Sequence, residues 1–182
     1  MIEISLDTTQ LEHGLSELLK NATNTRPMMR AIATEMVSLT EKNFESESWG
    51  GDRWPDSVRS LSETLDPKRN RRGKTLQLSG QLAASISTQV GIDFARIGSN
   101  KPYAAIHHLG GQTAAHEIRP LHKKVLAFYT QNGDSAVARS VQHPGSKIPA
   151  RPYLPINASG RLQPGAEKRL LDIALESLKK GL

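Results

Sequence analysis

The most constraining pattern in the sequence lies between Met29 and Phe44, where apolar side chains recur at intervals of three and four residues. This spacing places them on one face of an α-helix and leaves the charged residues between them to face water. Pro27 suits the first turn of such a helix, where a backbone N–H is not needed. The apolar face is formed by Met29, Ile32, Ala33, Met36, Val37, Thr40 and Phe44.

Two further helices are predicted from the same kind of pattern. Asp7, Thr8 and Thr9 offer N-cap side chains ahead of a shorter helix, and the pattern breaks at residues 22–25. Two amphipathic helices with a short break favour an antiparallel pair over residues 1–46. A last helix is expected from about Pro164. The apolar faces are Leu11, Leu15, Leu18 and Leu19 in the first helix, and Ala166, Leu170, Ile173, Ala174 and Leu178 in the last.

Composition limits what else the chain can be. The 182 residues fit one domain over 1–182, are 37% hydrophobic and 4% aromatic, and include no cysteine. We therefore expect a lean aliphatic core, with no disulfide, thiolate zinc site or cysteine nucleophile. No apolar run approaches the roughly 18 residues of a membrane span, and no signal peptide is evident. The expectation is a soluble protein of a reducing cytoplasm, with no membrane partner.

Charge is distributed unevenly along the chain. Residues 1–66 hold 6 Lys/Arg and 12 Asp/Glu, a net −6, whereas residues 67–182 hold 18 and 6, a net +12. This asymmetry is compatible with nucleic acid, an anionic surface or a neighbouring subunit of complementary charge. The most basic stretch is a predicted solvated loop that contains Lys68, Arg69, Arg71, Arg72 and Lys74.

The rest of the chain predicts short elements. Residues 47–75 read as an irregular, basic loop region in which Trp49 and Trp54 anchor the chain onto a surface. A short helix is expected over 76–86, opened near Ser79, followed by strands at 88–92 and 95–98 and a helix over 102–111. Strands at 125–129 and 136–141 predict a hairpin within residues 112–147. Three prolines make residues 148–155 extended and place them at an edge or on a surface.

The usual catalytic constellations are missing. His107, His108, His116 and His122 fall close together, but adjacent helical histidines point about 100° apart and no His-Glu-x-x-His pattern is present. No nucleophile elbow, phosphate loop, dinucleotide fingerprint or carboxylate pair is found. We predict a non-enzyme with no cofactor, metal or small-molecule substrate. A DNA-binding accessory role for residues 68–74 remains the alternative, with salt-sensitive affinity.

Three motifs in order carry a resemblance. They are Leu76-Gln77-Leu78-Ser79-Gly80-Gln81-Leu82-Ala83-Ala84-Ser85-Ile86, then Ala95-Arg96-Ile97-Gly98-Ser99-Asn100-Lys101-Pro102-Tyr103-Ala104-Ala105-Ile106-His107-His108-Leu109-Gly110-Gly111, then Ile148-Pro149-Ala150-Arg151-Pro152-Tyr153-Leu154. In this order, from about Trp54 onward, the chain resembles the phage virion morphogenesis family, which includes protein G of Mu-like phages and tail completion proteins.

The resemblance implies a structural virion protein that acts at the neck or tail end. Residues 112–147 are longer than the shortest members of the family need between the second and third motifs, so the hairpin near 112–147 is expected to be an insertion. It implies a homo-oligomeric ring, hexameric or higher, assembled in the bacterial cytoplasm and in contact with other phage neck or tail proteins. Contact of the basic loop with packaged DNA is a further expectation. The motif positions expected at interfaces are Leu78, Ser79, Gly80, Leu82, Tyr103, Ile106, His107, Gly110, Gly111, Pro149, Arg151, Pro152 and Tyr153.

Arg151 and Tyr153 allow two interpretations. Both residue types are common at interface hot spots, and a proline-stiffened segment loses little entropy on docking. Alternatively, Arg151 pairs with an internal acid and Tyr153 packs in the core. The predicted fold is α+β: an N-terminal helical pair (1–46), the irregular region (47–75), and a core over 76–182 with a small mainly antiparallel sheet, short helices and a C-terminal helix.

Overall fold

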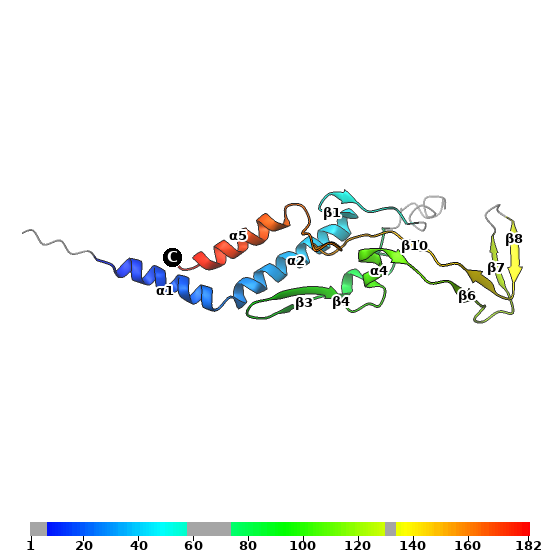
Figure 1. Cartoon of the computed structure of the whole chain (residues 1–182), viewed down its shortest axis with the longest axis horizontal. Coiled ribbons are helices and arrows are strands. Elements are labelled where there is room, and N and C mark those ends of the chain that lie inside the picture. The colour runs from blue at the N-terminus through cyan, green and yellow to red at the C-terminus, as the bar shows by residue number, and fades with distance from the viewer. Residues whose placement is uncertain (1–6, 58–73, 130–133) are drawn as a thin grey trace, which may run out of the picture.

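The computed structural model describes residues 7–57, 74–129 and 134–182, and it confirms the α+β class. Helices form where the apolar stripes predicted them: α1 at Thr9–Thr23, α2 at Arg26–Ser46 and α5 at Ala166–Lys179. Figure 1 shows a long molecule with these helices at one end and a narrow arm of strands at the other. None of the helices in the described ranges has the length and apolarity to cross a membrane.

The predicted antiparallel packing of the first two helices is wrong. In Figure 1, α1 and α2 follow one another in the same general direction, and α5 runs back along both. The two-residue break at Asn24 and Thr25 does not reverse the chain, because Thr25 keeps a right-handed helical conformation (φ −80°, ψ −2°). The packing partner of both helices therefore comes from the far end of the sequence.

Within the described ranges, each β-sheet consists of two antiparallel strands. The described elements are β1 (Ser48–Trp49) with β2 (Asp52–Arg53), β3 (Ile86–Val90) with β4 (Ala95–Ser99), and β5 (Gly111–Gln112) with β10 (Lys147–Ile148). They also include β6 (His116–Ile118) with β9 (Val141–His143), and β7 (Leu126–Tyr129) with β8 (Ser135–Ala138). The β3–β4 ladder packs against α2.

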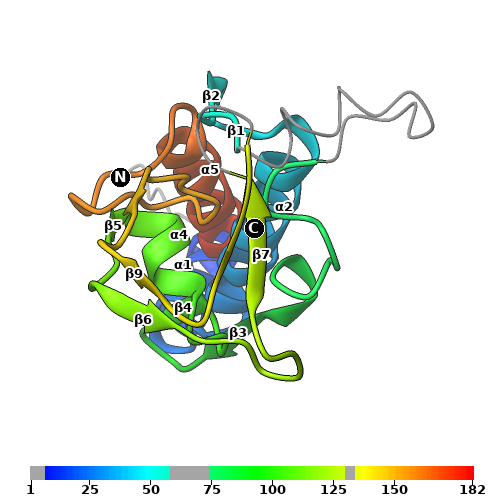
Figure 2. The ribbon, with the colours of Figure 1, turned by 90° about the vertical axis from the view of Figure 1, so that its right-hand side faces the viewer.

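Residues 112–147, which we call the arm, extend away from the body (Figure 1). In the end-on view of Figure 2, the arm strands β6, β7 and β9 lie in front of the helices. The predicted hairpin is present as β7–β8, but β8 ends at Ala138, whereas Val141 belongs to a separate ladder with β6. Successive ladders β5–β10, β6–β9 and β7–β8 therefore carry the chain outward and back.

The core differs from the expected aliphatic one. Its central cluster is Phe44, Trp54, Leu82, Ala104 and Tyr153, so three of the chain's few aromatic side chains meet in one place. Phe44 lies 5.3 Å from the Tyr153 ring, stacked, and 5.8 Å from the Trp54 ring, edge to face. The low aromatic fraction of the sequence limits the number of aromatic rings but does not determine where they lie in the fold. For this reason, composition alone did not predict an aromatic core.

The predicted helix over 76–86 is wrong except for one 3-10 turn, η2 (Ala83–Ser85). Leu76 and Gly80 take left-handed backbone angles (φ 62° and 69°), which interrupt a right-handed helix. Ile86 already begins β3. The helix predicted over 102–111 is present as α4 (Ala104–Leu109), ended by Gly110.

Candidate functional site

A proline-rich segment, residues 149–156, runs through the core, and we call it the strap. Its residues from 151 to 155 alternate between buried and half-buried, with Arg151 5% and Tyr153 2% exposed. The expectation of an extended segment is met, but its placement at an edge or surface is wrong. Proline excludes the strap from a hydrogen-bonded ladder, so its backbone groups need other partners in the interior.

The two tryptophans supply part of these partners. Trp54 Nε1 donates to the Pro152 carbonyl at 2.8 Å, and Trp49 Nε1 donates to the Leu154 carbonyl at 3.0 Å. Both indoles therefore anchor the 47–57 region, as expected, and they anchor it to the strap.

Asn43 is a structural residue that sequence reasoning missed. It is 2% exposed on α2, and its Nδ2 donates to the Tyr153 carbonyl at 3.1 Å and to Gln163 Oε1 at 2.7 Å. The available signal was position: Asn43 lies seven residues after Met36, on the apolar face of the helix. An amide on such a face needs a buried partner.

His108 completes the backbone pairing of the strap. Its Nδ1 accepts from the Tyr153 N–H at 3.2 Å, while its Nε2 lies 2.8 Å from the Ile156 carbonyl. This arrangement requires the neutral tautomer with the proton on Nε2. Burial lowers the pKa of His108, against an opposing effect of the bond to Ile156, and so favours that neutral form.

Tyr153 is held by contacts on several sides. Its hydroxyl donates to the Ala104 carbonyl of α4 at 3.1 Å, and the His108 ring lies edge-on at 4.9 Å. Burial raises the pKa of the phenol, which stays protonated. Tyr153 therefore packs in the core, as the second interpretation expected, and gives no free surface to a partner.

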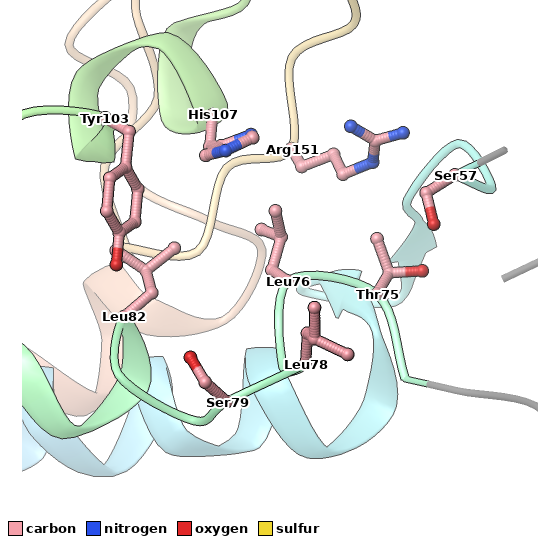
Figure 3. Close-up of a pocket in the computed structure, with 9 residues that line it drawn as sticks. All are labelled: Ser57, Thr75, Leu76, Leu78, Ser79, Leu82, Tyr103, His107 and Arg151. Atoms are coloured by element: carbon pink, nitrogen blue, oxygen red, sulfur yellow. The ribbon is translucent and has the colours of Figure 1, made fainter. Parts of the chain in front are cut away.

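The strap contains most of the third sequence motif. The first and second motifs meet it around a pocket of about 390 Å³. Figure 3 shows Tyr103 and His107, at the start of α4 and within it, on one side of the pocket, with Arg151 beside His107 and the 75–82 segment opposite. The lining residues are Ser57, Thr75, Leu76, Leu78, Ser79, Leu82, Tyr103, His107 and Arg151.

Arg151 carries a buried charge at this junction. Its Nε donates to the Pro55 carbonyl at 2.8 Å and its Nη2 to the Asp56 carbonyl at 3.0 Å. Its backbone N–H donates to the His107 carbonyl at 2.8 Å. Burial lowers the pKa of the guanidinium. Arg151 thus ties the third motif to the second and to residues 55–56. It does so through carbonyl groups, and not through the internal acid of the second interpretation.

His107 faces the same pocket. Its Nδ1 is buried without a hydrogen-bond partner, and its pKa is lowered by burial and, to a lesser extent, by the Arg151 charge. The pocket wall opposite this imidazole combines apolar and hydroxyl side chains of the 75–82 segment. Within the described ranges, no three metal-ligating side chains gather in one place, and His116 instead stacks on His143 at 5.1 Å.

Motif glycines allow the segments to approach closely. Gly110 has φ 75°, and a Cβ there would lie 2.8 Å from the Ala150 nitrogen and 3.1 Å from the Ile148 carbonyl oxygen. Gly111 pairs with Ile148 across β5 and β10, beside the half-buried Ile106. These two glycines therefore seat the second motif directly on the third.

The remaining predicted positions are more exposed. Leu78 is 74% exposed, Ser79 and Pro149 are exposed, and Tyr103 is 38% exposed at the pocket rim. Ser79 does not cap a helix as predicted, since its Oγ accepts only from the Gln81 N–H at 3.5 Å. Leu82 is buried and Pro152 half-buried. Lys74 is exposed, while Lys68, Arg69, Arg71 and Arg72 of the basic loop lie outside the described residues.

The arrangement assigns most of the motif residues to building the fold. Comparison with known proteins identifies the family to which this fold belongs. The chain matches the phage virion morphogenesis family over residues 6–179 and belongs to that family. The predicted resemblance is confirmed, and the chain is a phage structural assembly protein.

Three relatives are similar to this chain. The putative capsid assembly protein G of Escherichia phage Mu is 35% identical over 117 residues, 60% of this chain and 71% of that protein. Mu-like prophage FluMu G protein 2 of Haemophilus influenzae is 29% identical over 143 residues, 78% and 94% of the two chains. FluMu G protein 1 of the same organism is 28% identical over 148 residues, 71% and 98%. No solved structure matches.

Proposed function

We propose that this chain assembles into a closed ring of identical subunits at the phage neck or tail end, where it completes the tail or joins it to the head. The observation that carries the proposal is family membership over residues 6–179, which span nearly the whole described chain. The protein of phage Mu is named for capsid assembly. A position at the junction of head and tail fits both that name and the tail role implied by the sequence motifs.

The interior of the subunit supports a structural role without catalysis. The polar side chains of the motifs bond to backbone carbonyl and N–H groups: Arg151 to residues 55 and 56, and His108 to residues 153 and 156. Groups used in this way hold segments together and are not poised for proton transfer to a substrate. The partners in this proposal are further copies of the chain and other neck or tail proteins, within the virion.

Two measurements test the proposal, one on the purified chain and one on virions. Native mass spectrometry of the purified chain gives the number of subunits, and electron microscopy with labelled antibody gives the position in virions. The expected results are one discrete closed oligomer and label at the neck or tail end. A strict monomer that is absent from virions and tail assemblies would overturn the proposal.

A further inference from the structure

The arm has no core of its own. No described residue between Gly111 and Ala150 is buried, yet the arm carries large apolar side chains. Leu121 is 87% exposed, Val137 72%, and Val125 and Phe128 each 39%. Isolated two-stranded ladders are marginally stable in water and need a packing surface. The arm of a single subunit therefore lacks the burial that would hold it in place.

The helix α1, at the other end of the molecule, has the same deficiency (Figure 1). It contains no buried residue. Leu11, Leu15 and Leu19 lie four residues apart, share one helix face, and are 61%, 57% and 66% exposed. The contacts of α1 with α5 use a different face, through Asn21, whose Nδ2 donates to the Leu178 and Lys180 carbonyls.

The two ends differ in charge. The arm holds Arg119, Lys123, Lys124, Arg139 and Lys147 against Glu117 and Asp134, a net +3. Residues 7–23, which form α1 and the residues just before it, hold Asp7, Glu12 and Glu17 against Lys20, a net −2. Asp7 and Glu12 lie at the start of α1, beside the leucine face. The two apolar surfaces therefore have flanks of opposite charge, which steers them together and fixes their register.

We propose that the arm of one subunit packs on the leucine face of α1 in the next copy of this chain. This inference rests on the proposed ring, and it names the contact from which the ring is built. Because the surfaces lie on opposite ends of one subunit, the contact is head-to-tail, so each copy uses both surfaces. Head-to-tail contacts close into rings or continue as filaments, depending on the rotation between copies.

Charge and apolarity argue for this occupant over others. Two α1 helices packed face to face would bring their acidic flanks together. DNA phosphates would neutralise the arm lysines but leave the exposed leucine, valine and phenylalanine side chains uncovered. An arm on α1 covers both apolar surfaces and pairs both sets of charges.

A matched pair of leucine variants tests the helix side. Leu15→Asp places a charge in the proposed contact, and Leu171→Asp is the control, because Leu171 on α5 has the same exposure of 57%. In sedimentation velocity we expect Leu15→Asp to raise the dissociation constant more than tenfold and Leu171→Asp to leave it within threefold. Unchanged thermal unfolding of both variants would show that the subunit is intact. Equal effects of the two substitutions would overturn the assignment to α1.

A charge exchange tests the pairing itself. Lys123→Glu with Lys124→Glu, or Asp7→Lys with Glu12→Lys, should each weaken association at least tenfold at low salt. Mixing the two doubly substituted proteins creates two kinds of contact, and the contact of reversed arm with reversed helix should regain most of the affinity. No recovery in the mixture would overturn the inference. A wild-type monomer would instead contradict the ring itself, whereas a wild-type oligomer insensitive to every variant would contradict only this contact.

Discussion

Substitution of Tyr153 separates a fold-building role from an interface role. The side chain is 2% exposed, stacks on Phe44, lies edge-on to His108 and donates a hydrogen bond to Ala104. Tyr153→Phe removes only the hydroxyl bond, and a typical net loss is about 1 kcal/mol. Tyr153→Ala removes the ring, and large-to-small changes of aromatic residues in cores cost about 3–5 kcal/mol.

These losses are measured by urea unfolding of the dissociated subunit, followed by circular dichroism at low protein concentration. With a total stability of about 5–15 kcal/mol, Tyr153→Ala should leave a marginal fold, whereas Tyr153→Phe should fold and assemble as wild type. A Tyr153→Ala variant that retains wild-type stability but loses assembly would contradict the core role, because that result would place the Tyr153 side chain on an intersubunit surface.

Three further predictions concern the same junction and the basic loop. Burial lowers the pKa of His108, so the unfolded state binds the proton more readily than the folded state. The free energy of unfolding should therefore be greatest above pH about 6.5 and should fall as the pH decreases below that value. In urea titrations, His108→Ala should lose about 1–3 kcal/mol at pH 7.5 and should depend less on acid than wild type does. Gly110→Ala should lower the free energy of unfolding by about 2 kcal/mol or more, because the added Cβ would collide with the Ala150 backbone. Gly80→Ala is the control: it also has a positive φ (69°) but open space around it, and it should cost about 1 kcal/mol in the same assay. Replacing Arg69, Arg71 and Arg72 with alanine should reduce docking to phage particles while thermal unfolding stays unchanged; if the loop is instead a DNA-binding element, the triple variant will flatten the salt dependence of DNA affinity.

The helices could be predicted because their signal is local. The stripe from Met29 to Phe44 and the stripe from Ala166 to Leu178 both identify elements that the structure contains. Their arrangement depends on contacts between distant segments, such as the ion pair of Arg169 with Glu35 at 3.0 Å. Periodicity gives the face of a helix that is buried, and it carries no information on which element buries it.

The strap could be predicted only in part for a related reason. Its prolines made the backbone extended, but placing it at the surface assumed that only a ladder can satisfy a backbone in the interior. Side chains from Asn43, Trp49, Trp54 and His108 do so instead. These residues are spread over 66 positions of sequence, so no local pattern reveals their convergence. The three motifs were recognisable by their order, while their meeting at one pocket required the fold.

We propose that this phage structural protein works as a closed ring of identical subunits, and native mass spectrometry of the wild-type chain at low and high ionic strength measures this property. We expect one closed oligomer, hexameric or higher, whose population decreases as salt screens the proposed charge pairs between arm and helix. A chain that stays monomeric at every concentration and salt level would contradict it.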